Sequence, residues 1–484
     1  MPTTRDLVEA YGFASRRQVL ALLNGDDSVA IDARRRLNRS LLGGLLVCVA
    51  IVAAVGVAGF LSGGSSTSLP NQGVIVDSST GGNYVLVDNV LHPALNLASA
   101  RLIAGSQSTT VSSGTLRKLP RGLPVGIPGA PDQLPPTSSL VSGPWTVCST
   151  APQASAARPR ITVSVGAAIP TPVATGGSVV LSGPNGQLWL LAGGLRFAVT
   201  QPAATLLQLD RAAPVPVLDQ ILSLVPQGPP LTLPSVPDAG RQPSVRLPFT
   251  ASVGDVVRAT LAGRTRAYYV VLDRGVAPIG SFAAALLGGT SAGQHTVTVS
   301  AADLARTPSV RASFLPTSWP NALRPVAPPR SGQPLCLTYA RSLPLTGGAW
   351  PVSVSEPRSA PLPAHGRAVA ASSGGLPTVA TGVAVPPGRG SLVKATGSGG
   401  VDGSYEFIAD SGLRYPISSS TSVTRLGYMT SAAAVTPLPF VQLLPSGPAL
   451  DPSRAAVEYP GGAGSSVAPT GSATSTPTAV STPR

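Results

Sequence analysis

Leu41-Leu-Gly-Gly-Leu-Leu-Val-Cys-Val-Ala-Ile-Val-Ala-Ala-Val-Gly-Val-Ala-Gly-Phe-Leu61 is the stretch around which the rest of the chain is organised. It contains no charged residue, no proline and no amide side chain. At about 1.5 Å per residue, a helix of this length crosses a hydrocarbon core of about 30 Å. A buried core helix and a cleaved signal peptide are the alternatives, and the second fails on length and on the long polar segment before it. The sequence therefore predicts one transmembrane helix over residues 41–61.

The charges on either side of this helix predict its orientation. Several arginines precede it, whereas no lysine or arginine follows it until Arg101. Membrane proteins keep the more basic flank in the cytoplasm. The N-terminus is therefore expected in the cytoplasm, and everything after Leu61 on the other side of the membrane. The preceding arginines are Arg5, Arg16, Arg17, Arg34, Arg35, Arg36 and Arg39.

The composition favours short strands and turns over long helices. Of 484 residues, 53 are glycine and 51 are proline, and only 11% are charged. The net charge of +14 is carried almost entirely by arginine, since the only lysines are Lys118 and Lys394. The arginines are scattered, and an outer domain does not meet cytoplasmic DNA. The charge therefore does not indicate a nucleic-acid partner.

Three cysteines divide between the two sides of the predicted membrane. Cys48 lies in the membrane helix and is expected to act as a small apolar residue. Cys148 and Cys336 both lie outside, in an oxidising space, where they can pair. Closing so long a loop is worth about 4–5 kcal/mol in the chain-entropy model. The alternative is two unpaired buried thiols.

Residues 1–40 are expected to form a cytoplasmic amphipathic arm. Ser15-Arg-Arg-Gln18 has the spacing of a helix-capping box, an apolar stripe runs from Val19 to Leu23, and Asn24-Gly25 supplies a stop. A lone helix this short is marginal in water, so the preferred interpretation is docking on a cytoplasmic partner or on the inner leaflet. The alternative is a helix that merely precedes the anchor.

An internal repeat organises the outer domain, which is expected to span residues 73–459. Each copy combines a short strand, a tight turn and a return strand. The turns carry residues that tolerate a positive φ, so each copy is predicted to be a hairpin. The copies are Tyr84–Pro93, Leu188–Phe197, Tyr268–Pro278 and Tyr405–Pro416, with turns at Asp88-Asn89, Gly193-Gly194, Asp273-Arg274-Gly275 and Asp410-Ser411-Gly412.

Two further features follow the hairpins. First comes a short piece suited to one or two helical turns, and then, in three copies, an aliphatic-Pro-x-Gly motif. One such unit cannot bury both faces of its hairpin, so the copies should pack on one another or on a central piece. The helical pieces are Leu97–Ile103, Ala203–Leu209, Phe282–Leu287 and Ser431–Val435; the motifs begin at Leu119, Val225 and Leu444, and Ala305-Arg-Thr-Pro308 is a weak third-copy candidate.

A central β domain is expected between the copies. Trp145–Cys148 and Pro334–Tyr339 resemble its strands, and Ser244–Val253 alternates like another strand. The predicted fold class is α+β, with a single N-terminal transmembrane helix followed by a central β domain flanked by four hairpin-helix repeats. Stretches rich in small and polar residues are expected as a flexible spacer at 62–72, a linker at 352–400 and a disordered tail at 460–484.

Several stretches resemble the EccB family, a core membrane subunit of the type VII (ESX) secretion system of actinobacteria. They are Tyr84–Leu102, Pro120–Asp132 and Pro144–Cys148, within which Gly126-Ile-Pro-Gly-Ala-Pro-Asp132 is highly specific. The anchor near residue 50, the two outer cysteines and the four repeats agree over nearly the full length. The resemblance is weakest in residues 1–40 and beyond residue 340.

The resemblance implies a single-pass protein of the inner membrane with an elongated periplasmic domain. It implies association with EccC, EccD, EccE and a mycosin protease, homo-oligomerisation, and passage of WXG100 and PE/PPE-type substrates through the complex. The function implied is a structural scaffold whose periplasmic domain self-associates to help form the export path. The alternatives are an ATPase of the same complex, as family members are described, and a cell-wall-binding module.

The residues themselves give little support to enzyme chemistry. A P-loop needs a Gly-Lys pair to cradle and contact phosphates, and the sequence contains none. Gly289-Thr-Ser-Ala-Gly293 imitates a nucleophile elbow, with His295 close by, but a helix is predicted before it and a strand after it, in the reverse order. His92, His295 and His365 have no cysteine or histidine at zinc-ligand spacing. We predict no catalytic residue, no metal and no cofactor; the predicted site residues are the disulfide pair Cys148 and Cys336.

Overall fold

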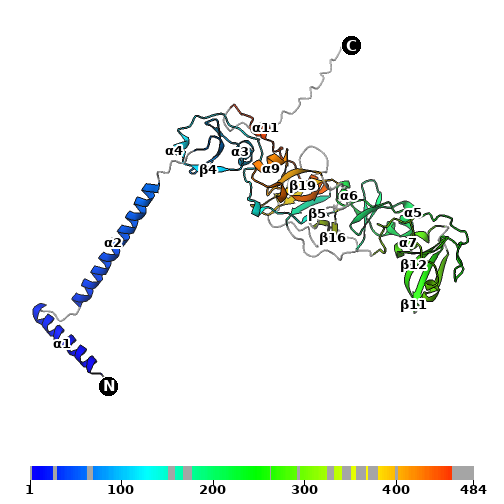
Figure 1. Cartoon of the computed structure of the whole chain (residues 1–484), viewed down its shortest axis with the longest axis horizontal. Coiled ribbons are helices and arrows are strands. Elements are labelled where there is room, and N and C mark those ends of the chain that lie inside the picture. Colours follow the sequence, from blue (N-terminus) through cyan, green and yellow to red (C-terminus); the bar gives the residue numbers. More distant parts are fainter. Residues whose placement is uncertain are drawn as a thin grey trace, which may run out of the picture. The chain divides into compact units, whose positions relative to one another are not determined.

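The computed structural model mixes helices and strands, as the α+β fold class predicts. The chain divides into two compact units, residues 1–69 and residues 70–484 (Figure 1). Most of the predicted spacer at 62–72, and all of the predicted tail except Pro460, lie outside the described residues. The described residues are 3–24, 30–62, 69–150, 159–166, 177–261, 263–290, 295–323, 332–340, 350, 352–355, 367–368, 380–397 and 402–460.

The first helix of the first unit, α1 (Thr4–Asn24), begins earlier than predicted. Its N-terminus is capped by Asp6, whose Oδ2 accepts hydrogen bonds from Thr3 N at 2.9 Å and from Thr3 Oγ1 at 2.7 Å. Thr3 and Asp6 thus have the capping-box spacing that we assigned to Ser15 and Gln18. The predicted start at Ser15 is wrong, because α1 runs through it and the Ser15 hydroxyl bonds back to Gly12 O at 3.3 Å. The predicted end at Asn24 agrees with the structure.

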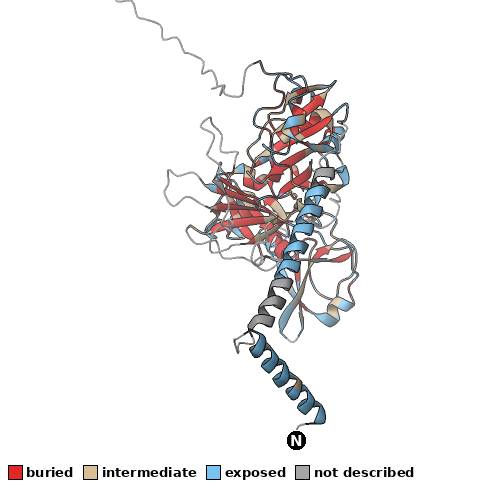
Figure 2. Ribbon diagram, turned by 90° about the vertical axis from the view of Figure 1, so that its left-hand side faces the viewer, coloured by how far each residue is buried: buried red, intermediate tan, exposed pale blue. Residues whose placement is uncertain are grey.

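The second helix, α2 (Ala30–Ser62), contains the apolar stretch. Its window Ser40–Val57 has a mean hydropathy of 2.6 and is entirely unburied. It is the one helix among the described residues that is long and apolar enough to cross a membrane. Because α2 begins at Ala30, the arginines at 34–39 share its helix, and the predicted boundary at residue 40 is not a structural break. The described turns of α1 and α2 are exposed, whereas the strands of the second unit are largely buried (Figure 2).

Five β-sheets make up the described part of the second unit, and four of them share one strand order. In each of these four, three consecutive strands form an antiparallel meander, and a later fourth strand lies parallel to the first. A short helix precedes the fourth strand and another follows it. We call these four assemblies repeats 1 to 4.

The repeats have the following bounds. Repeat 1 contains β1 (Gly73–Asp77), β2 (Asn83–Val87), β3 (Val90–Pro93), α3 (Leu97–Ala104), β4 (Ser108–Val111) and α4 (Ser113–Leu116). Repeat 2 contains β7 (Val179–Ser182), β8 (Leu188–Ala192), β9 (Leu195–Ala198), α5 (Gln201–Leu206), η2 (Leu209–Arg211), β10 (Val215–Pro216) and α6 (Asp219–Ser223). Repeat 3 contains β11 (Val256–Leu261), β12 (Arg264–Leu272), β13 (Gly275–Ile279), α7 (Ser281–Leu287), β14 (Thr296–Ser300) and α8 (Ala301–Ala305). Repeat 4 contains β19 (Gly390–Thr396), β20 (Gly403–Ala409), β21 (Arg414–Ile417), α9 (Ser420–Arg425), η3 (Thr430–Ala432), β22 (Ala434–Pro437) and α10 (Leu438–Gln442), followed by α11 (Pro452–Ala455).

The aliphatic-Pro-x-Gly motif lies beside the third strand of each meander. In repeat 1, Leu91 N donates to Pro120 O at 2.8 Å and Gly122 N donates to Leu91 O at 3.1 Å. Repeats 2 and 4 make the same pair of bonds through Pro226 and Pro445. In repeat 3, Val276 N donates to Pro308 O at 2.8 Å, so the weak candidate at Pro308 occupies the same position. The motif therefore closes one edge of each sheet.

The glycine of the motif is required by an aromatic ring on the neighbouring strand. A Cβ added to Gly447 would overlap the ring of Tyr415, and one added to Gly228 would overlap Phe197. Gly122 stands in the same relation to His92. In repeat 3 the larger and the smaller residue are exchanged: Val310 stands at the glycine position and Ala277 at the ring position. The close approach of backbone and ring thus explains why the motif lacks its glycine in repeat 3 alone.

The fifth sheet has six strands in the order β16-β15-β5-β6-β18-β17. Cys148 on β5 lies directly opposite Cys336 on the antiparallel β15, and the two form a disulfide. Both cysteines are buried. The strands are β5 (Trp145–Thr150), β6 (Arg160–Val165), β15 (Pro334–Tyr339), β16 (Val352–Ser355), β17 (Arg367–Ala368) and β18 (Gly382–Ala384), and η1 (Thr137–Ser139) precedes them.

Shared hydrophobic cores connect the five sheets. Repeats 2 and 4 both pack on the six-stranded sheet, through residues such as Leu181 and Ile408. The opposite face of repeat 4 shares a core with repeat 1, and the opposite face of repeat 2 shares a core with repeat 3. The sheets are therefore linked in the order repeat 1, repeat 4, six-stranded sheet, repeat 2, repeat 3.

One strand prediction and one linker prediction are wrong. Residues 244–253 form no strand; Leu247, Phe249 and Ala251 do alternate toward the repeat 3 sheet, but the segment covers that sheet without joining its ladder, and Pro248 has no N–H to donate. Residues 352–400 are not simply a linker, because they include β16, β18 and β19. Valine side chains such as Val352, Val383 and Val393 are buried there. They are outnumbered by small residues, so the average composition of the segment did not indicate strands.

The fourth predicted helical piece is also misplaced. The helix of repeat 4 is α9 (Ser420–Arg425), whereas Ser431–Val435 contributes a single 3-10 turn and the start of β22. The side chain of Ser419 caps α9 by accepting a hydrogen bond from Ser422 N at 3.1 Å. Val423 and Leu426 are buried in the core shared with repeat 1. Burial of these two residues outweighs the weak helix propensity of the serines and threonines around them.

Candidate functional site

The specific motif Gly126–Asp132 wraps the start of α3. Asn96 caps α3, its Oδ1 accepting hydrogen bonds from Ser99 N at 2.9 Å and from Ser99 Oγ at 2.6 Å. Asn96 Nδ2 donates to Ile127 O at 2.8 Å, and Ile127 N donates to Ser99 Oγ at 2.8 Å. Asn96 and Ser99 are both buried. Since each polar group finds a partner in this network, the motif fixes the position of α3 rather than offering free groups to a ligand.

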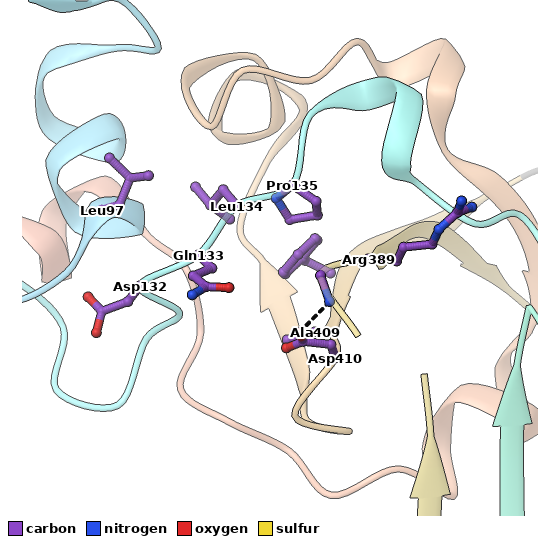
Figure 3. Close-up of a pocket in the computed structure, with 10 residues that line it drawn as sticks. Leu97, Asp132, Gln133, Leu134, Pro135, Arg389, Ala409 and Asp410 are labelled. Carbon is purple, nitrogen blue, oxygen red and sulfur yellow. Dashed lines mark hydrogen bonds between the residues drawn. The ribbon is translucent and has the colours of Figure 1, made fainter. Parts of the chain in front are cut away.

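The motif ends at a pocket between repeats 1 and 4, with a cavity volume of about 300 Å³ (Figure 3). Leu134 and Phe407 supply buried apolar walls. Exposed polar side chains lie at its rim, and one of them, Asp410, accepts a hydrogen bond from Gly388 N at 2.9 Å. The lining residues are Leu97, Asp132, Gln133, Leu134, Pro135, Gly388, Arg389, Phe407, Ala409 and Asp410.

This pocket has the chemistry of a packing site rather than of an active site. Its ionisable groups are Asp132, Asp410 and Arg389, all exposed, and it is lined by no histidine, cysteine, serine or lysine. No group of three or more metal-ligating side chains occurs in the described part of the chain. The pocket therefore contains neither a nucleophile with its base nor a metal centre.

Helices α3 and α9 join repeats 1 and 4 by reciprocal hydrogen bonds. Arg101 Nη1 donates to Leu426 O at 2.9 Å, and Arg425 Nη1 donates to Leu102 O at 2.7 Å. Both bonds place a positive charge near the C-terminus of a helix, where it is favourable. Tyr428 adds a third link, donating from its hydroxyl to Pro135 O at 2.8 Å. Burial raises the pKa of Tyr428, so this hydroxyl keeps its proton and remains a donor.

Repeats 2 and 3 pair through α5 and α7, but with apolar contacts. Phe282 and Leu286 of α7 share a core with Ala203 and Ala204 of α5. Trp319 packs edge-on against Phe282 with ring centroids 6.1 Å apart. Both repeat pairs thus make contact through the helix that follows the third strand, and both bury apolar residues there. The pair of repeats 1 and 4 adds the two arginine hydrogen bonds.

Only Gly289, Thr290 and His295 of the segment that resembles a nucleophile elbow belong to the described residues. Gly289 follows α7, where an added Cβ would overlap Leu206 of repeat 2, so this glycine serves the contact between repeats 2 and 3. Ser291 to Gly293 lie outside the described residues. His295 immediately precedes β14. The order helix, glycine segment, strand is the reverse of a nucleophile elbow, as the sequence predicts.

The remaining predicted residues lie apart from one another. His92 Nδ1 is 3.0 Å from Leu123 O and 3.8 Å from Glu458 Oε1, close to the junction of the C-terminal segment with repeat 1. His365 lies outside the described residues. Lys118 follows α4, and Lys394 lies in the middle of β19. Neither lysine follows a strand at the start of a helix, which is where a P-loop lysine lies.

The residues that pair the repeats are not evident in the sequence. Arg101 and Arg425 stand on short helices in different repeats, and no local pattern relates them. The ring and glycine pairs did leave a signal, because an aromatic ring precedes each motif glycine by about 30 residues in repeats 1, 2 and 4, and both members change together in repeat 3.

The fold and its contacts define a class of protein with one candidate membrane helix among the described residues and a body of repeats paired through short helices. The chain belongs to the family described as Type VII secretion system ESX-1, transport TM domain B, whose model matches residues 1–462. This bears out the resemblance to the EccB family seen in the sequence.

Two relatives illustrate the sequence similarity. The chain is 31% identical over 492 residues to "ESX-3 secretion system ATPase EccB3" of Mycolicibacterium smegmatis, covering 94% of this chain and 90% of that protein. It is 33% identical over 411 residues to "ESX-2 secretion system ATPase EccB2" of Mycobacterium tuberculosis, covering 78% of this chain and 80% of that protein.

Two solved structures share the fold. A chain of an intact ESX-5 inner membrane complex matches with a TM-score of 0.64 and 25% identity, covering 97% of this chain and 98% of that chain. A chain from the structure of an EccB3 dimer from the ESX-3 core complex matches with a TM-score of 0.65 and 28% identity, covering 80% of this chain and 100% of that chain.

Proposed function

We propose that this chain is a structural subunit of a type VII (ESX) secretion complex of the inner membrane, and that its large body self-associates to help form the export path. The observation that carries the structural role is the pairing of the repeats within the chain, in which short helices and shared cores join segments more than 300 residues apart. Membership of a family whose solved relatives lie in ESX inner membrane complexes supports it.

The finer arrangement follows from the same proposal. Residues 1–40 form a cytoplasmic arm, 41–61 the membrane segment, 62–72 a spacer, 73–459 an elongated periplasmic domain and 460–484 a tail. The periplasmic domain is a central β domain, the six-stranded sheet, flanked by four hairpin-helix repeats. The Cys148–Cys336 disulfide supports a periplasmic location, because disulfides persist in oxidising compartments.

The partners proposed are those that the family implies. They are EccC, EccD, EccE and a mycosin protease, with WXG100 and PE/PPE-type proteins as the cargo of the complex. Extracting the tagged full chain from membranes and identifying what co-purifies tests this proposal. Recovery of the chain without EccC, EccD and EccE would count against it.

An ATPase role is the alternative, and the names of the relatives carry that word. The sequence has no Gly-Lys pair, and the pocket between repeats 1 and 4 presents one cationic side chain beside two carboxylates, which repel phosphates. We therefore expect no ATP turnover by this chain. The test is ATP hydrolysis by the purified full chain beside its Lys118→Ala and Arg389→Ala variants. A rate that survives stringent purification and falls in one variant would overturn the expectation.

A further inference from the structure

Repeat 3 presents an open strand edge. Its last strand, β14, pairs with β11 on one side, and no described strand lies on the other. Val256 N donates to His295 O at 3.2 Å, which directs the backbone groups of residues 295, 297 and 299 toward β11. Because successive residues alternate, the N–H and C=O of Thr296 and Thr298 point away from the sheet and meet no other described strand. Unpaired groups of this kind are a template for another strand.

The corresponding edges of repeats 2 and 4 are closed. β10 and β22 each end at a proline, Pro216 and Pro437, which has no N–H to donate. Most residues of β22 are buried as well. Only β4 of repeat 1 resembles β14 among the described fourth strands, since it is likewise free of proline and partly exposed. The opposite edge of every repeat is closed by its Pro-containing motif segment.

The sequence of β14 is complementary to itself. Thr296-Val-Thr-Val-Ser300, paired antiparallel with a second copy about Thr298, sets Val297 opposite Val299 and Thr296 opposite Ser300. Cross-strand pairs of β-branched residues and of hydroxyl residues are favourable, and no charge opposes another. The valines continue the apolar face formed by Val257 and Ala259. The four residues of β4, paired with themselves in this way, set Ser108 opposite Val111.

We propose that β14 is a homotypic docking edge, at which two copies of this chain join their repeat 3 sheets into one continuous sheet centred on Thr298. The inference rests on the proposed function, of which self-association is a part. A contact of one strand with its own copy is two-fold symmetric and closes on itself, as the interfaces of most protein dimers do. It uses backbone groups that the repeat already directs outward.

A cross-link tests the pairing directly. Thr298→Cys is introduced into the full-length chain that also carries Cys48→Ala. Membranes that contain this chain are mildly oxidised, and the products are separated on a non-reducing gel. The matched control is Thr110→Cys, which points outward from β4 in the same way. We expect a covalent dimer from Thr298→Cys at least tenfold more abundant than from Thr110→Cys. Absence of the dimer, or equal yields from the two variants, would overturn the inference.

A charge substitution separates this inference from the proposed function. Thr298→Lys sets two like charges opposite each other, and native mass spectrometry of the detergent-extracted chain is expected to show at least a tenfold loss of dimer, with Thr110→Lys unaffected. Circular dichroism and an intact Cys148–Cys336 disulfide report that the variant is folded. If the Thr298→Lys chain remains oligomeric, the interface lies elsewhere and the proposed function stands. If the unaltered chain is itself a monomer, both fail.

Discussion

Arg101 and Arg425 each donate a hydrogen bond to the end of the other's helix, although they lie in repeats 1 and 4 and are separated by most of the chain. The bonds run to Leu426 O at 2.9 Å and to Leu102 O at 2.7 Å. This reciprocity gives the two repeats a local two-fold relationship. It also makes the contact sensitive to loss of either side chain, because each arginine satisfies carbonyls that a helix end leaves unpaired.

Replacing either arginine should loosen the junction of repeats 1 and 4. A hydrogen bond from a charged donor contributes about 1.5–3 kcal/mol, so Arg101→Ala and Arg425→Ala should each destabilise by about that amount. Hydrogen exchange of the amides in α3 and α9 measures the effect locally. Lys118→Ala, an exposed substitution in repeat 1, is the control. Unchanged exchange in both arginine variants would show that the junction does not depend on these bonds.

The ring and glycine pairs predict a non-additive pair of substitutions. Gly447→Ala forces a Cβ into the ring of Tyr415, which should cost about 1–3 kcal/mol of unfolding free energy. Removing the ring relieves that overlap, so Gly447→Ala with Tyr415→Ala should cost less than the sum of the two single changes. Denaturant unfolding of the four chains measures this coupling. Strict additivity would contradict it. Val310→Ala, at the equivalent position of repeat 3, where Ala277 takes the place of the ring, is the control.

Thiol labelling tests the disulfide. The chain has three cysteines, of which Cys148 and Cys336 are joined and Cys48 is free. Alkylation of the unfolded, unreduced chain should therefore modify one cysteine, and reduction should raise this to three. Modification of all three without reduction would exclude the bond. Replacing Cys148 and Cys336 with serine should cost about 2–5 kcal/mol.

Acid should weaken repeat 1 through Asp77. Ser79 N donates to Asp77 Oδ1 at 3.0 Å, and Ser113 Oγ donates to the same carboxylate at 2.7 Å. These bonds favour the charged form and hold the pKa of Asp77 below its ordinary value of 3.8. The stabilisation is thus fully present above pH 3.8 and is lost as the pH falls from there through the lower pKa of the folded state.

Asp77→Asn should remove this part of the pH dependence. The variant is expected to be less stable than the unaltered chain at neutral pH and to approach it as the pH falls below about 4. Hydrogen exchange in β1 and β4 at a series of pH values measures the difference. Asp132→Asn, at the pocket rim, controls for the loss of a carboxylate. A constant difference between Asp77→Asn and the unaltered chain at every pH would show that Asp77 contributes nothing through its charge.

The local elements of the fold were predictable where the residue types themselves favour one backbone conformation or one environment. Asp88 and Asn89 both adopt a positive φ, at 48° and 65°, in the first predicted hairpin turn. Gly193 and Gly194 do the same in the second, at 58° and 77°. The apolar run at 41–61 lies within α2, and the cysteines lie on neighbouring strands. The turns and the apolar run are each contiguous in the sequence, whereas the two cysteines are 188 residues apart and were paired on the compartment they share.

The sequence was less informative where burial decides the structure. Ser244–Val253 has the alternation of a strand but covers a sheet instead of joining it, and Pro248 has no N–H with which to pair. The α9 residues have the composition of a serine-rich loop, and they form a helix because Val423 is buried in the core shared with repeat 1. The pairing of repeat 1 with repeat 4, and of repeat 2 with repeat 3, depends on tertiary packing, which no local sequence pattern predicts.

The proposed structural role is tested by native mass spectrometry of the complex, extracted from membranes through a tag on the full chain. We expect one large assembly that contains two or more copies of this chain together with other membrane subunits, without ATP turnover attributable to this chain. A chain recovered alone, as a monomer that hydrolyses ATP, would contradict it.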